Sequence, residues 1–386
     1  MAERIEAMVE PELLVWARAK SGYNVETAAK KANLSAARLS AWEAGEARPS
    51  VKQLRKLARV YGRRIALFYL SEPPADFPPI KDYRRAWGEE HQAPSPELRS
   101  EIHLAQERRA VALELIEDEA REPPHFQLRA SLDEDPENVA QRVRTALGIS
   151  VEEQTDWENA RVAFNAWRFA IEGFGALVLQ MTEVSTREAR GFSIAESRLP
   201  AVVANNRDPF PARSFSLIHE LAHAAIRQSG ICDLAGHRGV EPFCNHVAGA
   251  VLVPAASLLD ERVVRGHGGS FEWDDPELIQ LARTYQVSRE VVLRRLLILR
   301  RTDERFYNQK RRQLLDEYER RESEPRETGP VPPSTKAVIR AGHYFSKLVL
   351  SSYSHGLITG SDVATYLGVR LKHVPRIEQL VSGRQG

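Results

Sequence analysis

Two histidines four residues apart, with a glutamate directly after the first, are the residues best suited to chemistry: His219, Glu220 and His223 in SFSLIHELAHAAIRQ. Residues i and i+4 lie on one face of an α-helix, so both imidazoles can reach one metal ion. Zinc takes nitrogen ligands, and a catalytic zinc site keeps one position for water. Glu220 lies about 100° around the helix from His219, where its carboxylate can approach that water.

The residues around this motif favour a helix that runs through a protein core. Most of them are apolar, and no proline interrupts the run. Ala222, Ala224 and Ala225 are small and leave room beside the histidines. The pattern therefore predicts a metal site. The alternative is a buried helix whose histidines are satisfied by ordinary hydrogen bonds.

A catalytic zinc site needs a third protein ligand, and the sequence offers several. Glu241 begins a second predicted helix, VEPFCNHVAGAVLVPAASL, eighteen residues beyond His223. An antiparallel return of that helix would bring this carboxylate back towards the two histidines. Asp233, His237 and His246 are also within reach, although His246 lies about 140° around the helix from Glu241.

The elements that would position these residues are mostly helices. Helical patterns cover about residues 96–120 and 135–147 and resume at the motif. Two stretches, 175–181 and 201–205, have the composition of strands, with GFSI between them as a weaker third. The expected fold is mainly α with a small β-sheet, in the α+β class.

Two proline-rich, polar stretches divide the chain, because such segments do not continue a helix. We therefore predict a helix-turn-helix-like domain at 8–72, a linker at 73–96, the motif-bearing domain at 97–321, a second linker at 322–336 and a helical C-terminal region at 337–386.

The first seventy residues have apolar positions at helical spacing and the form of a helix-turn-helix. In VETAAKKANLSAARLSAWEAG, a turn at Asn33-Leu34 follows a first helix, and Ser35 stands as the N-cap of a second. The run WEAG, followed by Arg48-Pro49-Ser50, resembles the phage-repressor type of helix-turn-helix, the XRE family. The resemblance covers about residues 10–70.

This resemblance implies that the second helix enters the major groove of DNA, where Arg38 is its only charged outward residue. Through residue 70 the chain has thirteen Lys/Arg against seven Asp/Glu, an excess that favours contact with phosphates. A helix-turn-helix kept for dimerisation or docking is the alternative. The residues predicted to contact DNA are Ala36, Ala37, Arg38, Ala41, Arg48 and Lys52.

The motif region closely resembles the ImmA/IrrE metallopeptidases over about residues 155–300. The similar features are HELAH, the pattern ExxCNxxA at 241–248 and LVP at 252–254. The resemblance implies a zincin-like domain between the helix-turn-helix and a small helical C-terminal appendage. It implies zinc held by His219, His223 and Glu241, with Glu220 as the general base.

Two roles near this site stay open. Asn245 could orient the carboxylate of the third ligand, or it could be a helix cap or a surface amide. The residue that stabilises a developing oxyanion could be His237, His246 or Tyr285.

The predicted function is zinc-dependent cleavage of a protein by a chain that also binds DNA. The family resemblance implies that the substrate is a helix-turn-helix repressor, and the strand at 201–205 is expected to pair with its extended backbone. The alternatives are a non-proteolytic DNA-binding regulator or an antitoxin-like protein, with the metal domain as a sensor or docking surface. Glu220 argues against a sensor, because sensing needs no base.

Composition and charge are typical of a soluble globular protein, with 42% hydrophobic and 28% charged residues and a net charge of +1. The acidic start lacks an apolar signal core, and no apolar run approaches the ~18 residues that cross a bilayer. Two cysteines cannot form a disulfide framework, so we expect a cytoplasmic protein without a membrane partner. A homodimer is one open option.

Overall fold

The computed structural model describes residues 6–74, 77, 81–82, 94–227, 230–232, 239–323 and 331–382. The chain packs into two compact units. The first comprises Met1–Pro79 and Glu90–Glu107, and the second comprises Ile80–Glu89 and Arg108–Gly386. The predicted domain boundaries stay predictions, because much of both proline-rich linkers lies outside the described residues.

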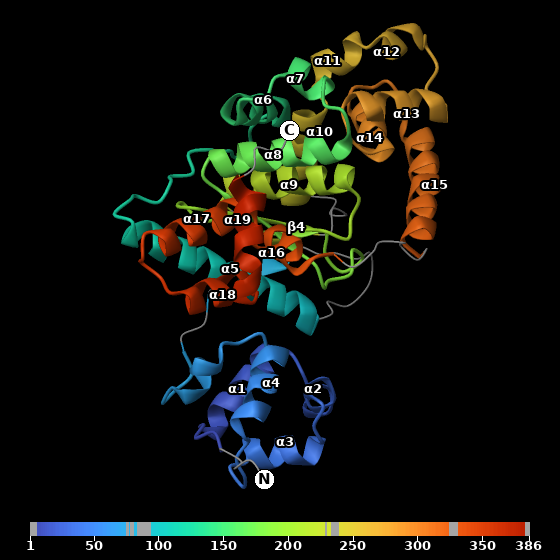
Figure 1. Ribbon diagram of the computed structural model, residues 1–386. Coiled ribbons are helices and arrows are strands. Elements are labelled where there is room, and N and C mark those ends of the chain that lie inside the picture. Colours follow the sequence, from blue (N-terminus) through green and yellow to red (C-terminus); the bar gives the residue numbers. More distant parts are fainter. Residues whose placement is uncertain are drawn as a thin grey trace. The chain divides into compact units, whose positions relative to one another are not determined.

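The first unit is a bundle of short helices around one small core (Figure 1). A hydrogen-bonding side chain begins three of them: Asn24 caps α2, Ser35 caps α3, and Ser50 forms a capping box with Gln53 at α4. Asn33 adopts the left-handed conformation (φ 57°) between the second and third helices, so the predicted turn and cap are confirmed. The elements are α1 (Pro11–Lys20), α2 (Val25–Ala32), α3 (Ala36–Glu43), α4 (Val51–Val60) and the short 3-10 helix η1 (Ile65–Tyr69).

An ion pair holds α3 against α1. Glu43, in the WEAG run, accepts hydrogen bonds from Nε and Nη2 of Arg18 at 2.7 and 2.8 Å. This two-point contact fixes direction as well as distance, so α3 is held in a defined orientation within the unit.

The second unit is built on a five-stranded mixed sheet in the order β1-β5-β3-β4-β2. The three predicted strands are confirmed as β2 (Leu177–Met181), β3 (Gly191–Ile194) and β4 (Ala201–Asn205). β1 (Lys81–Asp82) and β5 (Gly230–Cys232) were not predicted, because strands of two or three residues leave no alternating pattern to detect.

β4 lies inside the sheet. It pairs in parallel with β2 along its whole length, and β3 pairs with its other edge in antiparallel orientation. The prediction that this strand pairs with an extended substrate is therefore wrong for this structure, since both of its edges already have partners. The outer edge of β3 pairs with β5, and β5 pairs with β1.

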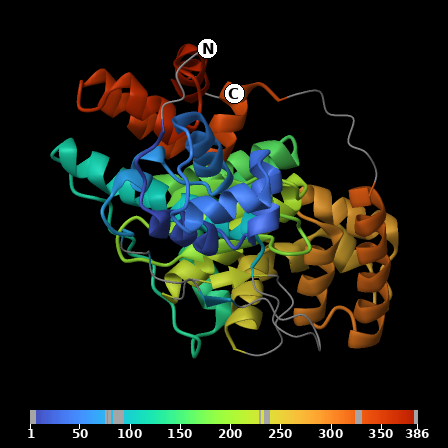
Figure 2. The same cartoon turned by 90° about the horizontal axis from the view of Figure 1, so that it is seen from below.

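Helices cover the sheet, and β2, β3 and β4 are buried along their full lengths. α9 packs against β3 and β4, while α16 and α17 pack against β2. The orange helices α13–α15 and the red helices α16–α19 lie on different flanks of this unit (Figures 1 and 2). The mainly helical α+β class is confirmed, and within the described ranges no helix is long and apolar enough to cross a membrane.

The remaining helices differ greatly in length. They are α5 (Pro96–Asp118), α6 (Pro136–Leu147), α7 (Val151–Thr155), α8 (Ala160–Gly173), α9 (Phe210–Ala225), α10 (Val240–Leu252), α11 (Ala255–Asp260), α12 (Arg262–Gly266), α13 (Asp275–Thr284), α14 (Arg289–Ile298), α15 (Glu304–Ser323), α16 (Pro333–Ala341), α17 (His343–Ser354), α18 (Gly360–Leu367), the 3-10 turn η2 (Leu371–His373) and α19 (Val374–Ser382).

The C-terminal helices dock on the sheet through the start of α17. A carboxylate oxygen of Glu172, on α8, accepts the backbone N–H of Tyr344 at 3.1 Å. Gly342 has φ 77°, and a Cβ built there would collide with the carbonyl oxygen of Val178 in β2. Only glycine permits this close approach of backbone to backbone.

Candidate metal centre and DNA-binding surface

The two motif histidines lie on the buried face of α9. His219, Glu220 and His223 have no exposed surface. The Nε2 atoms of His219 and His223 are 3.1 Å apart, so both imidazoles turn towards one point. The helix forms as predicted because apolar and small residues surround the motif without interruption, and all residues from Ser214 to Ala225 are buried.

Glu241 brings its carboxylate to the same point from the first turn of α10. Its Oε2 is 3.3 Å from Nε2 of His219, and its Oε1 is 3.1 Å from Nε2 of His223. α9 and α10 pack against each other, and this packing brings Glu241 back to the histidines, as the sequence predicted. Among the residues that the structure describes, these three form the one group able to offer a metal ion three ligand atoms within 4.8 Å of one another.

The spacing of these atoms fits zinc. Ligands at 2.0–2.1 Å in a tetrahedron are separated by about 3.3–3.4 Å. The 3.1 Å between the two imidazole nitrogens approaches that value, and the two Glu241 oxygens lie 3.1 and 3.3 Å from one of these nitrogens each. Two imidazole nitrogens and one carboxylate form a donor set of the kind found at catalytic zinc sites, with one position left for water.

The electrostatics of the cluster favour the protonation states that bind metal. Burial lowers the pKa of His219 more than its carboxylate neighbour raises it, which favours the neutral imidazole. Burial disfavours a charged Glu241, but His219 and His223 hold the pKa of its carboxyl well below the usual range. A neutral histidine and an ionised glutamate are the ligand forms that a metal requires.

Most of the residues predicted to contact DNA are exposed, unlike the buried residues of the metal cluster. Ala37, Arg38, Arg48 and Lys52 are exposed, with Nη1 of Arg48 3.0 Å from the sulfur of Met8. Their exposure leaves these four side chains able to reach a nucleic acid. Ala36 and Ala41 are half-buried, and Ala36 packs against the small core.

Comparison with known families agrees with both regions. Residues 14–68 match the helix-turn-helix family model, and residues 175–297 match the peptidase-family model described as IrrE N-terminal-like domain. The chain joins a helix-turn-helix domain to an IrrE-like peptidase domain. No curated protein matches it. The resemblance seen in the sequence is confirmed, and the protein combines a helix-turn-helix domain with a metallopeptidase-family domain.

The other residues considered as a zinc ligand or as the oxyanion-stabilising group contact different partners or lie outside the described residues. Nε2 of His246 lies 2.8 Å from Oε1 of Glu137, on α6. The hydroxyl of Tyr285 is 2.7 Å from that of Ser257. Asp233 and His237 lie outside the described residues. Asn245 is buried on α10, one turn after Glu241, and its role stays a prediction.

An ion pair between buried Arg295 and half-buried Glu137 anchors α10. Nη1 and Nη2 of Arg295, on α14, donate to the Glu137 carboxylate at 2.6 and 3.0 Å, and Nε donates to the Val253 carbonyl at 2.9 Å. With the His246 contact, this carboxylate connects α6, α10 and α14. Burial opposes ionisation, but His246 and Arg295 lower the pKa of Glu137 to about 2. Sequence reasoning missed this anchor, since single residues on three separate helices leave no local pattern.

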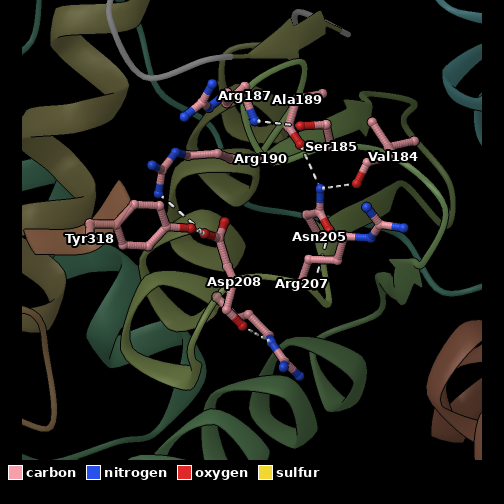
Figure 3. A network of polar contacts seen from close by, with 10 residues as sticks. Val184, Ser185, Arg187, Ala189, Arg190, Asn205, Arg207, Asp208 and Tyr318 are labelled. Carbon is pink, nitrogen blue, oxygen red and sulfur yellow. Dashed lines mark hydrogen bonds and ion pairs between the residues drawn. The ribbon is translucent and has the colours of Figure 1, made fainter. Parts of the chain in front are cut away.

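A second polar network fixes the start of α9 and the start of β3 (Figure 3). Buried Asp208 accepts hydrogen bonds from the Tyr318 hydroxyl at 2.5 Å and from Nη1 of Arg190 at 3.3 Å. The amide of Asn205 donates to the carbonyls of Val184 and Ala189 at 3.1 and 2.8 Å. Burial, with Asp208 adding to it, raises the pKa of Tyr318 to about 12, so its hydroxyl remains a donor.

Proposed function

We propose that this chain is a zinc-dependent peptidase that also binds DNA, and that its substrate is a helix-turn-helix repressor protein. The observation that carries the proposal is the convergence of His219, His223 and Glu241, with Glu220 next to the first ligand. These three residues would hold zinc, and Glu220 would act as the general base.

Bound zinc would polarise a scissile carbonyl and make a bound water acidic. Each residue of the chain then has a separate task. His219, His223 and Glu241 hold their donor atoms in place before any metal arrives, because α9 and α10 pack together. The Glu220 carboxylate accepts the proton of the attacking water and passes it to the leaving amine.

The repressor as substrate is supported by the resemblance to the ImmA/IrrE peptidases, and DNA binding by the exposed basic residues of the helix-turn-helix domain. In such a peptidase, the same chain would bind DNA and cleave a regulator that also binds DNA. The four site residues are at most 4% exposed, so cleavage requires an opening that admits an extended peptide.

The same burial favours a second candidate function, a non-proteolytic regulator that responds to metal. A closed ligand cluster is sufficient for metal sensing, and such a protein has no use for a base at position 220. The two functions differ in what they require of Glu220, and this difference can be measured.

The test is to incubate the purified full-length protein, loaded with zinc, with candidate repressors. The Glu220→Gln variant should keep one zinc per chain and lose about 10²–10⁴-fold in cleavage rate, because an amide cannot take the proton. Glu153→Gln is the matched control, an exposed glutamate of the same unit, and it should cleave normally. Equal cleavage by Glu220→Gln and wild type would exclude the peptidase mechanism.

A further inference from the structure

The carboxylate of Glu220 lies against a glycine on β3. A Cβ built on Gly191 would be 2.7 Å from Oε1 of Glu220 and 3.1 Å from its Cγ. The first distance is shorter than any ordinary van der Waals contact, so no other residue fits at position 191 unless Glu220 moves. The same Cβ would lie 2.9 Å from the carbonyl oxygen of Val203 on β4.

Neither the backbone of Gly191 nor the side chain of Glu220 can move easily. Gly191 pairs with Ala204 on one side and with Cys232 on the other. The carbonyl of its neighbour Arg190 accepts the backbone N–H of Asn205 at 2.8 Å, and the Arg190 side chain is bound to Asp208. Figure 3 shows this network at the start of β3.

Glu220 is equally confined. Its side chain is fully buried between α9 and the sheet, and α9 packs directly on β3 and β4. A carboxylate pushed from its position must therefore displace packed neighbours rather than swing into solvent.

We propose that Gly191 is a positioning residue: the absence of a side chain there defines where the Glu220 carboxylate lies. The catalytic consequence of this contact rests on the proposed peptidase function, but the contact itself does not. Adding one methyl group at position 191 should move the carboxylate, whereas none of the three heavy atoms nearest to the added carbon belongs to His219, His223 or Glu241.

The first test measures the contact without any substrate. Gly191→Ala should lower the Tm of the full-length protein by several degrees, because it overpacks the space between β3 and α9. In a Glu220→Ala background the Cγ and Oε1 atoms are gone, and the same change should lower the Tm much less. The difference between the two effects is the coupling between the residues.

Gly249→Ala is the matched control for this cycle. Gly249 lies on buried α10, and a Cβ there would meet Cδ of Arg295 at 3.2 Å rather than Glu220. Its effect on the Tm should be the same in both backgrounds. If Gly191→Ala also had the same effect in both, the strain would lie against Val203 alone, and the proposal would be wrong.

The second test measures the catalytic consequence. Gly191→Ala should keep one zinc per chain and lower kcat about 10²-fold with little change in KM, because a small misplacement of a reacting group is enough. Glu220→Asp removes Oε1, the atom closest to the added carbon, so adding Gly191→Ala to Glu220→Asp should cause a smaller further loss in kcat than adding it to wild type. A full additional loss would contradict the proposal. If wild type cleaves no candidate repressor, the proposed function fails, and the Tm cycle still decides the role of Gly191.

Discussion

The helix-turn-helix domain and the IrrE-like domain place their candidate chemistry in opposite environments. In the first, Arg38 and Lys52 are exposed and only fourteen residues apart on neighbouring helices. In the second, the site side chains are at most 4% exposed and come from α9 and α10, with Gly191 of β3 against one of them.

The difference follows from the chemistry. Contacts to phosphate act by releasing counterions, which happens at a surface in water and tolerates mobile side chains. Metal binding and proton transfer need fixed geometry and a site shielded from bulk solvent. We therefore expect single changes in the IrrE-like domain to have large, position-dependent effects, and changes on the helix-turn-helix surface to have small, additive ones.

The largest expected effect is the loss of metal. His223→Ala or Glu241→Ala should abolish tight zinc binding, a greater loss than the roughly 10–100-fold caused by changing an outer-shell partner. His246→Ala is the control, since that imidazole contacts Glu137 instead. Metal analysis of protein purified without added zinc is the measurement. A full equivalent of zinc in Glu241→Ala would show that this carboxylate is not a ligand.

The next largest effect concerns the anchor of α10. Glu137→Ala should lower the free energy of unfolding by at most about 3–5 kcal/mol, the range for a fully buried pair, because it leaves the buried Arg295 guanidinium without its carboxylate. Glu134→Ala removes the exposed partner of Arg142 and should lower the free energy of unfolding far less, because water screens that pair. Urea unfolding compares the two. An equal loss of stability in the two variants would mean that the burial of an ion pair does not determine how much its removal destabilises this domain.

A pH-dependent effect is expected where the C-terminal helices dock. Burial raises the pKa of Glu172 from 4.5 to about 7. Between these values the unfolded chain releases a proton that the folded chain keeps. The free energy of unfolding should therefore fall as pH rises from 4.5 to 7, by about 3 kcal/mol at most. The full loss of unfolding free energy is reached above about pH 7, the pKa of Glu172 in the folded protein.

Glu172→Gln isolates this contribution, because its side chain does not ionise and can still accept the Tyr344 N–H. Urea unfolding of both proteins at pH 5 and pH 8 is the measurement. Wild type should lose more stability than Glu172→Gln over this interval. Parallel losses would show that the carboxyl titrates normally.

The smallest effect is expected on DNA binding. Lys52→Ala should weaken binding several-fold on all sequences and reduce the slope of log K against log salt by about 0.9. Lys31→Ala removes the same charge from a side chain already 3.1 Å from Glu97, and it should change the slope less. Gel shifts across a salt series are the measurement. Neither variant should alter zinc content, because neither residue is one of the proposed metal ligands, and a loss of zinc would contradict this expectation.

The sequence was most informative where function depends on local spacing. The helix of the HELAH motif, the turn at Asn33 and the cap at Ser35 could be predicted, because each depends on residues within one or two helical turns. The roles of His219, Glu220, His223 and Glu241 also came from the sequence and stay predictions. The substrate pairing predicted for β4 failed because strand order is set by long-range pairing that no local pattern records.

The sequence by itself determined the two domain types, the motif helix and a short set of possible third ligands. Only the tertiary structure decided among the described candidates, bringing Glu241 to the histidines and turning His246 towards Glu137. It alone placed Gly191 against Glu220. The physical reason is distance along the chain: spacing within a helix is set by 3.6 residues per turn, whereas a contact between α9, α10 and β3 depends on how whole elements pack.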